Sequence, residues 1–211
     1  AYPENLVARN NLGNIYLQQD KVEAALQQFG LIHPSAANIH EVYNNHGNAL
    51  ERIGDLAGAK EKFEHAIMLN PNHPISLNNL ANVQKKMGKI SSAIECLEKA
   101  LVIKPKYPEA HNNLGNCFVE KGDLEKAKKS YRKALAIKPD YYEALYNLGL
   151  VQHAMREHVQ CVDSLNALIS SSKGESSYSL RAKILVAKSL WQLGREREFK
   201  ACLSKLVELD L

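Results

Sequence analysis

The sequence predicts an all-α solenoid, in which antiparallel helix pairs of one repeating type stack one after another along the chain. Three observations lead to this fold class: a period of 34 residues, small residues at two positions of each period, and glycine and proline at two others. A fixed period of this length is typical of repeat architectures, in which each unit contacts only its neighbours. No single unit can bury its apolar face alone, so at least three stacked units are needed for stability.

The period is clearest in asparagine-rich segments such as HNNLGN at residues 111–116. One asparagine recurs every 34 residues, at Asn11, Asn45, Asn79, Asn113 and Asn147. Small residues follow at Gly13, Gly47, Ala81, Gly115 and Gly149, and again at Ala25, Ala59, Ala93, Ala127 and Cys161. Large side chains recur at Phe29, Phe63, Leu97, Tyr131 and Leu165. The small residues let paired helices approach closely, and we expect the large ones to fill the space between one pair and the next.

Glycine and proline mark the predicted helix ends. Turn glycines, where a first helix should end in the left-handed conformation, stand at Gly54, Gly88 and Gly122. Prolines that should follow the second helix stand at Pro71, Pro105 and Pro139. Each unit is therefore two helices of roughly 12 to 14 residues joined by a tight turn. We expect one array over residues 1–211, with units 6–39, 40–73, 74–107, 108–141, 142–175 and 180–211.

The outer units depart from the pattern. Asp20 and Arg156 replace the turn glycine, and Pro34 arrives early, so the second helix of the first unit should end differently. The segment SSSKGESSYS at 170–179 is predicted to be a surface loop, either a spacer or a phosphorylated segment. In the last unit, Phe199 takes a small-residue position and should open the helix pair slightly.

The start of the chain allows two interpretations. Pro3 stands at the phase of a terminal proline, which fits a segment cut from a longer protein. It also fits a proline that opens an extended first helix.

Bulk composition excludes several classes of function. The 211 residues are 45% hydrophobic and 24% charged, an ordinary balance that disfavours disorder. No apolar run approaches the ~20 residues that span a bilayer, so membrane insertion is not expected. The net charge of +4 is too slight to indicate a nucleic-acid partner.

The cysteines indicate a reducing compartment. They are far apart and form no CxxC pair, which disfavours a disulfide frame or zinc knuckle and favours reduced thiols in the cytoplasm. They are Cys96, Cys117, Cys161 and Cys202.

No motif for catalysis, metal or cofactor binding is recognisable. The eight histidines form no HExxH, no glycine-rich phosphate loop occurs, and no Ser, His and acid set can be assembled. We therefore predict a non-enzyme without catalytic residues, metal or cofactor. One basic run is interpreted as a solvated face because acidic neighbours accompany it and no aromatics interleave. It comprises Lys126, Lys128, Lys129, Arg132 and Lys133.

The whole pattern resembles the tetratricopeptide repeat. One complete unit carries its features at Leu114, Gly115, Phe118, Gly122, Asp123, Ala127, Tyr131, Ala134 and Pro139. The resemblance covers nearly the whole chain. It implies a right-handed superhelical solenoid of antiparallel helix pairs whose first helices line a concave groove.

The asparagines are the candidate partner-binding residues. At about 100° per residue, Asn112, Asn113 and Asn116 fall opposite the apolar side of their helix, which the resemblance makes the groove wall. Each amide offers two donors and an acceptor that can pair with a peptide backbone. Three rows result. The ladder row is Asn11, Asn45, Asn79, Asn113 and Asn147; the second row is Asn14, Asn48, Asn82 and Asn116; the third row is Asn10, Asn44, Asn78 and Asn112.

The ladder row resembles the asparagine ladder in the repeat domain of O-linked N-acetylglucosamine transferases, which holds peptides by their backbone. The third row stands where carboxylate-gripping co-chaperone repeats carry lysine, so a carboxylate clamp is not expected. Two alternatives to ligand contact remain: inherited copies on a solvated face, and bonding between helices inside the wall.

The predicted function is a protein-interaction scaffold whose groove binds an extended peptide or a helix of a partner protein. The alternative is the substrate-recruiting segment of a larger enzyme, such as a glycosyltransferase, with catalysis elsewhere. Self-association through Trp191, Leu193 and Phe199 is a third hypothesis. Replacing Asn79 and Asn113 by alanine should weaken binding and leave thermal stability nearly unchanged.

Overall fold

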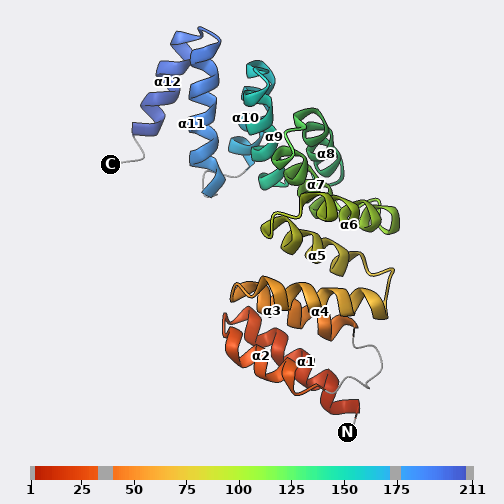
Figure 1. The fold of residues 1–211 in the computed structure, drawn as a ribbon. Helices are drawn as coiled ribbons and strands as arrows, with labels where there is room; N and C mark the ends of the chain where they lie inside the picture. The colour runs from red at the N-terminus through yellow and green to blue at the C-terminus, as the bar shows by residue number, and fades with distance from the viewer. Residues whose placement is uncertain (1–2, 33–39, 172–176, 208–211) are drawn as a thin grey trace. The chain divides into compact units, whose positions relative to one another are not determined.

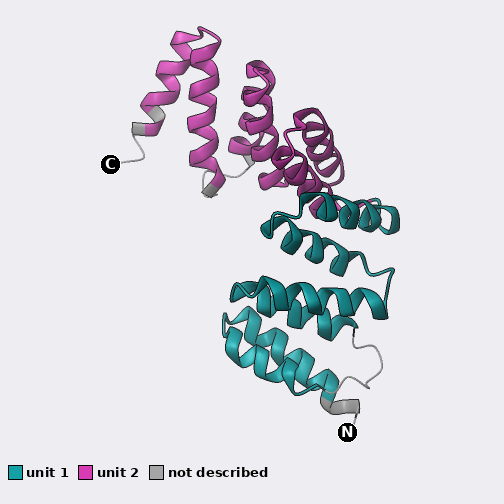
Figure 2. Ribbon diagram, viewed as in Figure 1, with its two compact units in different colours: residues 1–105 teal, residues 106–211 magenta. Residues whose placement is uncertain are grey.

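The computed structural model describes residues 3–32, 40–171 and 177–207, and every secondary-structure element in these ranges is an α-helix (Figure 1). The chain divides into two compact units, residues 1–105 and residues 106–211 (Figure 2). Among the described residues, no helix is long and apolar enough to cross a membrane. The predicted all-α solenoid of helix pairs is confirmed.

Unit 1 consists of three helix pairs. They are α1 (Pro3–Gln18) with α2 (Val22–Gly30), α3 (His40–Arg52) with α4 (Leu56–Leu69), and α5 (Pro74–Lys86) with α6 (Ile90–Ile103). α2 ends at Gly30, before Pro34, and is shorter than α4 and α6, in line with the expectation that this helix ends differently. Asn70 and Lys104, each followed by proline, close α4 and α6.

Unit 2 consists of three further pairs. They are α7 (Pro108–Glu120) with α8 (Leu124–Ile137), α9 (Tyr142–Ala154) with α10 (His158–Ser171), and α11 (Ser177–Gln192) with α12 (Glu196–Val207). The loop expected at 170–179 is too wide, because its first two serines end α10 and its last three residues open α11. The middle of that segment, 172–176, lies outside the described residues.

The turns between paired helices keep one backbone conformation even where glycine is missing. Gly54, Gly88 and Gly122 have φ of 83°, 75° and 80°, which confirms the predicted left-handed helix ends. Asp20 and Arg156 adopt the same conformation, with φ of 59° and 63°. The left-handed region is unfavourable for residues with a Cβ, so both positions carry backbone strain.

The recurring large side chain packs in two directions. Phe63 lies over Gly47 of its own pair, where an added Cβ would be only 2.7 Å from the ring. The same ring clusters with Leu80 and Val83 of the following pair. The expected filling between pairs is thus confirmed, and the glycine is required because the ring occupies the place of its side chain.

First helices form the inner layer of each unit. In unit 1, α3 contacts both α1 and α5, and in unit 2, α9 contacts both α7 and α11. Among the described residues, no comparable contact joins α2 to α4, α4 to α6, or α8 to α10. Consecutive first helices are therefore closer together than second helices, and their side chains line the inner face of each unit.

Candidate functional site

The predicted asparagine rows lie on consecutive first helices, and in each unit they form hydrogen bonds between neighbouring helix pairs. The exposure of the rows differs. Ladder-row residues are half-buried except the exposed Asn11, and second-row residues are all half-buried. In the third row, only Asn10 is half-buried; the others are buried.

In unit 1, the ladder amide of one pair donates to asparagines of the preceding pair. Asn79 Nδ2 on α5 donates to Asn44 Oδ1 at 3.1 Å and to Asn48 Oδ1 at 3.0 Å, both on α3. Asn45 Nδ2 on α3 donates to Asn10 Oδ1 on α1 at 3.0 Å. Both amide hydrogens of Asn79 are therefore used between repeats.

Unit 2 repeats this geometry. Asn147 Nδ2 on α9 donates to Asn112 Oδ1 at 3.2 Å and to Asn116 Oδ1 at 3.1 Å, both on α7. Asn112 Nδ2 in turn donates to Glu143 Oε1 on α9 at 2.9 Å. Bonding between helices, one of the alternatives left open by the sequence, is thus present in both units.

Three of the four third-row residues, Asn44, Asn78 and Asn112, are buried, although they were expected on the groove surface. Asn44 is 6% exposed and Asn112 is completely buried. The physical reason is the following first helix, whose side chains pack against them: Asn79 on α5 contacts Asn44, and Glu143 and Asn147 on α9 contact Asn112. Asn44 Oδ1 accepts from Asn79 and also from Ser76 Oγ at 3.1 Å. These side chains satisfy buried polar groups and leave no surface for a ligand.

The second row keeps polar groups for other partners. Asn48 and Asn116 use their oxygens as acceptors between repeats, and their Nδ2 groups have no hydrogen-bond partner among the described residues. Asn116 Oδ1 also accepts from Tyr131 Oη at 2.7 Å. Each amide is thus held by its oxygen, with two donors remaining on a half-buried side chain.

The hydrogen bonds of Asn79 change the stability that we expect for the Asn79→Ala variant. Removing this side chain deletes two hydrogen bonds between α5 and α3, each worth about 0.5–1.5 kcal/mol net. We therefore expect a loss of stability from this variant, in place of the nearly unchanged stability inferred from the sequence.

Sequence reasoning missed three polar members of these networks: Ser76, Tyr131 and Glu143. A signal for Tyr131 was present, because it carries a hydroxyl at a position that holds phenylalanine in the first two repeats. Burial raises the pKa of Tyr131, so its hydroxyl stays protonated and can donate to Asn116.

Within the described ranges, no three His, Cys, Asp or Glu side chains are grouped to hold a metal ion. All four cysteines are free. On α8, Lys128 pairs with Glu125 and Glu157, and Lys126 pairs with Asp123, so acidic neighbours partly neutralise the basic run.

Comparison with known families matches this geometry. Models described as TPR repeat match residues 85–118 and 115–155, and models described as tetratricopeptide repeat match 6–30, 40–73 and 180–211. Together these matches cover most of the chain. The chain belongs to the tetratricopeptide repeat family. Tetratricopeptide repeats are typically non-catalytic scaffolds for protein–protein interaction, and the fold gives this chain that general function.

Solved tetratricopeptide repeat structures resemble the chain along most of its length. PilF of Pseudomonas aeruginosa is 18% identical, with a TM-score of 0.81 over 98% of this chain and 92% of that chain. A MamA protein is 25% identical, with a TM-score of 0.71 over 80% of this chain and 90% of that chain. A tetratricopeptide repeat protein from Parabacteroides merdae is 15% identical, with a TM-score of 0.75 over 97% and 80%. None of the curated proteins matches the chain in sequence.

Proposed function

We propose that the inner face of each unit binds an extended peptide segment of a partner protein by its backbone, and that second-row amides supply the donors. The observation that supports this proposal is that two second-row amides each have the oxygen bonded and the nitrogen without a partner among the described residues. Asn48 and Asn116 have their oxygens fixed by neighbouring repeats, while their Nδ2 groups have no partner among the described residues. An extended peptide offers backbone carbonyls as acceptors for such donors.

Fixed oxygens make these donors effective. An amide held on one side loses little side-chain entropy when its nitrogen binds a ligand. Asn116 is held by two donors, Asn147 Nδ2 and Tyr131 Oη, and Asn48 by Asn79 Nδ2. Because the contacts are directed at the backbone, the face should accept many side-chain sequences. The proposal applies to each unit by itself.

Aspartate substitutions separate the two ends of the amide. Asn48→Asp and Asn116→Asp retain an oxygen for the bonds between repeats and remove the free donors. Asn72→Asp makes the same chemical change at an exposed turn and serves as the matched control. The probes are fluorescent peptides selected on the wild-type chain from a random phage-displayed library, each with a scrambled version of the same composition.

The double variant Asn48→Asp/Asn116→Asp should weaken peptide binding about 10-fold or more, since two hydrogen bonds are replaced by carboxylate–carbonyl repulsion. Asn72→Asp should bind like the wild type, and scrambled peptides should bind with similar affinity to the selected ones. Circular dichroism should show the helices unchanged in all three proteins. Unchanged binding by the double variant would contradict the proposal. Binding that is lost on scrambling would show side-chain recognition instead.

The larger-enzyme alternative uses the same face. In that case the peptides bound by the second row are segments of a substrate, and a catalytic domain is supplied by a longer protein. Sizing the protein in its source organism with an antibody against this chain distinguishes the two, because the alternative requires a species long enough to include an enzyme domain.

Self-association through the apolar residues of the last pair is a third hypothesis. Trp191 is 61% exposed, while Leu193 and Phe199 are half-buried. Sedimentation of the chain over a range of concentrations tests whether copies associate. The exposed surface at Trp191 itself fits a different occupant more closely.

A further inference from the structure

An open apolar groove of about 690 Å³ lies along α11 and α12, apart from the asparagine rows. Its apolar lining comes from Ile184 and Trp191 on α11 and from Phe199, Leu203 and Leu206 on α12. Ile184, Trp191 and Leu203 are 43%, 61% and 40% exposed. We call this surface the terminal groove. Its volume lies within the roughly 300–1,000 Å³ typical of binding pockets.

The repeat register shows what kind of element the terminal groove accommodates. Arg156 and Gly194 occupy the same left-handed turn position and align the last two pairs. In this alignment, Phe199, Leu203 and Leu206 of α12 correspond to Cys161, Leu165 and Leu168 of α10. The three α10 residues are completely buried. A helix covers them in unit 2, and the corresponding α12 side chains line the open groove.

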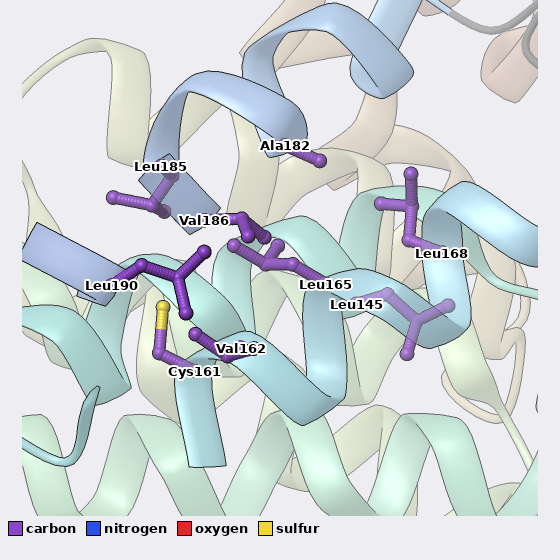
Figure 3. Packing of buried hydrophobic residues seen from close by; sticks show 9 residues of the cluster. All are labelled: Leu145, Cys161, Val162, Leu165, Leu168, Ala182, Leu185, Val186 and Leu190. Carbon is purple, nitrogen blue, oxygen red and sulfur yellow. The ribbon is translucent and has the colours of Figure 1, made fainter. Parts of the chain in front are cut away.

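The covering helix on α10 is α11. Figure 3 shows Ala182, Val186 and Leu190 of α11 converging with Leu165 and its neighbours in one buried cluster. α11 contacts both α9 and α10, so it lies in the groove between the two helices of the preceding pair. The terminal groove is the corresponding groove of the last pair, and it lies between α11 and α12.

The terminal groove lacks the asparagine acceptors that bind the ladder row in the other pairs. Ile184 and Lys188 of α11 stand at the register positions of Asn112 and Asn116, the two acceptors for the ladder amide of Asn147. Another asparagine-bearing first helix, such as α1 of a second copy, would place the amide of Asn11 where no acceptor is available. Burying an unpaired amide is unfavourable because its hydrogen bonds to water are lost without replacement. The terminal groove therefore fits an apolar helix face and disfavours α1 of a second copy of this chain.

The charges on α11 indicate the charge of the helix that would bind in the terminal groove. α11 carries Arg181, Lys183 and Lys188 and no acidic residue. Lys188 lines the terminal groove and has no ion-pair partner among the described residues. Two copies docked with α11 against α11 would bring two purely basic helices together. An acidic flank on the occupant would instead complement the groove.

We propose that the terminal groove binds an amphipathic helix of a partner protein, whose apolar face packs on Trp191 and Leu203 and whose flanking carboxylates meet Lys188. Recognition is by helix-in-groove packing, with apolar anchors spaced three and four residues apart. The site is separate from the asparagine face. Asn48→Asp/Asn116→Asp should therefore leave it unchanged, and either proposal can fail without the other.

Trp191 provides a direct readout because it is the only tryptophan of the chain. The probes are two synthetic helical peptides with the same leucine face, one with a glutamate face and the other with a lysine face. The glutamate peptide should shift Trp191 emission to shorter wavelength and protect it from acrylamide quenching. The lysine peptide should bind more weakly.

Two variants and a control locate the contact. Leu203→Glu should weaken binding of the glutamate peptide at least about 10-fold, as expected for truncating a central anchor and adding a like charge. Lys188→Glu should reverse the preference between the two peptides. Val159→Glu changes an exposed apolar residue on α10 that does not line the groove, and it should bind like the wild type.

Three results would overturn the proposal. Unshifted emission with the glutamate peptide would show that the groove does not bind such a helix. Equal binding of both peptides would remove the role of Lys188. A blue shift on concentrating the chain alone, together with a dimer in sedimentation, would identify a second copy as the occupant.

Discussion

Gly115→Ala tests the close packing that defines the helix pairs. A Cβ at residue 115 would lie 2.5, 2.7 and 2.8 Å from three ring atoms of Tyr131. Such distances are too short for carbon atoms, so the ring must move. Tyr131 is 1% exposed, and its hydroxyl bonds Asn116 at 2.7 Å. The ring therefore has no free space, and any shift also strains a hydrogen bond to the second row.

The magnitude follows from opposing effects. Alanine gains about 1 kcal/mol over glycine within a helix. Overpacking a filled core costs about 1–3 kcal/mol, and weakening the tyrosine bond costs about 0.5–1.5 kcal/mol more. We expect a net destabilisation of about 1–3 kcal/mol, which for a chain of this length lowers Tm by about 2–4 °C per kcal/mol.

The chain supplies its own matched control. The third repeat carries Ala81 and Leu97 at these two positions, and both are completely buried. In a Tyr131→Leu background, Gly115→Ala should therefore be neutral or slightly stabilising. Urea and thermal unfolding of the four proteins form a double-mutant cycle, with a coupling of about 1–3 kcal/mol. An equal effect of Gly115→Ala in both backgrounds would refute the assigned contact.

Two further predictions concern the turns and the histidines. Arg156→Gly should raise stability by about 0.5–1 kcal/mol in thermal unfolding, because it relieves the strain of a side chain at φ 63°, and Gly122→Arg should lower stability. Burial, with His40 as a second cause, lowers the pKa of His73, and burial with nearby His158 and Lys188 lowers that of His153. Folding favours the neutral forms of both histidines, so the stability they contribute should be complete above the unfolded pKa of 6.5 and should fall as pH drops below it. Replacing both histidines by glutamine should flatten this dependence of unfolding free energy on pH. An unchanged dependence in the double variant would contradict the assignment to these two histidines.

The fold was predictable because its signals are local. Gly54, Gly88 and Gly122 mark turns that need a left-handed residue, and this requirement is visible in the sequence of each turn. The ends of the serine-rich segment were placed wrongly because its local signal is ambiguous. Serine is compatible with both loops and helix ends, and α10 and α11 extend into the segment.

The candidate site was predictable only in part. The sequence placed the asparagines on first helices, but helical rotation alone did not distinguish an amide that faces solvent from one wedged against the next helix. Asn44 and Asn112 differ from Asn48 and Asn116 by one turn of the same helix, and only the neighbouring pair determines that the former are buried. The terminal groove likewise depends on the absence, among described residues, of a helix over α11 and α12.

The family, the helix pairs and their turns could be inferred from the sequence, because these features depend on spacings within one period. Which end of each amide is occupied follows from the packing of neighbouring helix pairs, which the sequence does not show. Asn79 donates to side chains 31 and 35 residues earlier, and such bonds exist only when neighbouring pairs have packed at one particular distance and rotation. The donors proposed for peptide binding are therefore a product of the packed array.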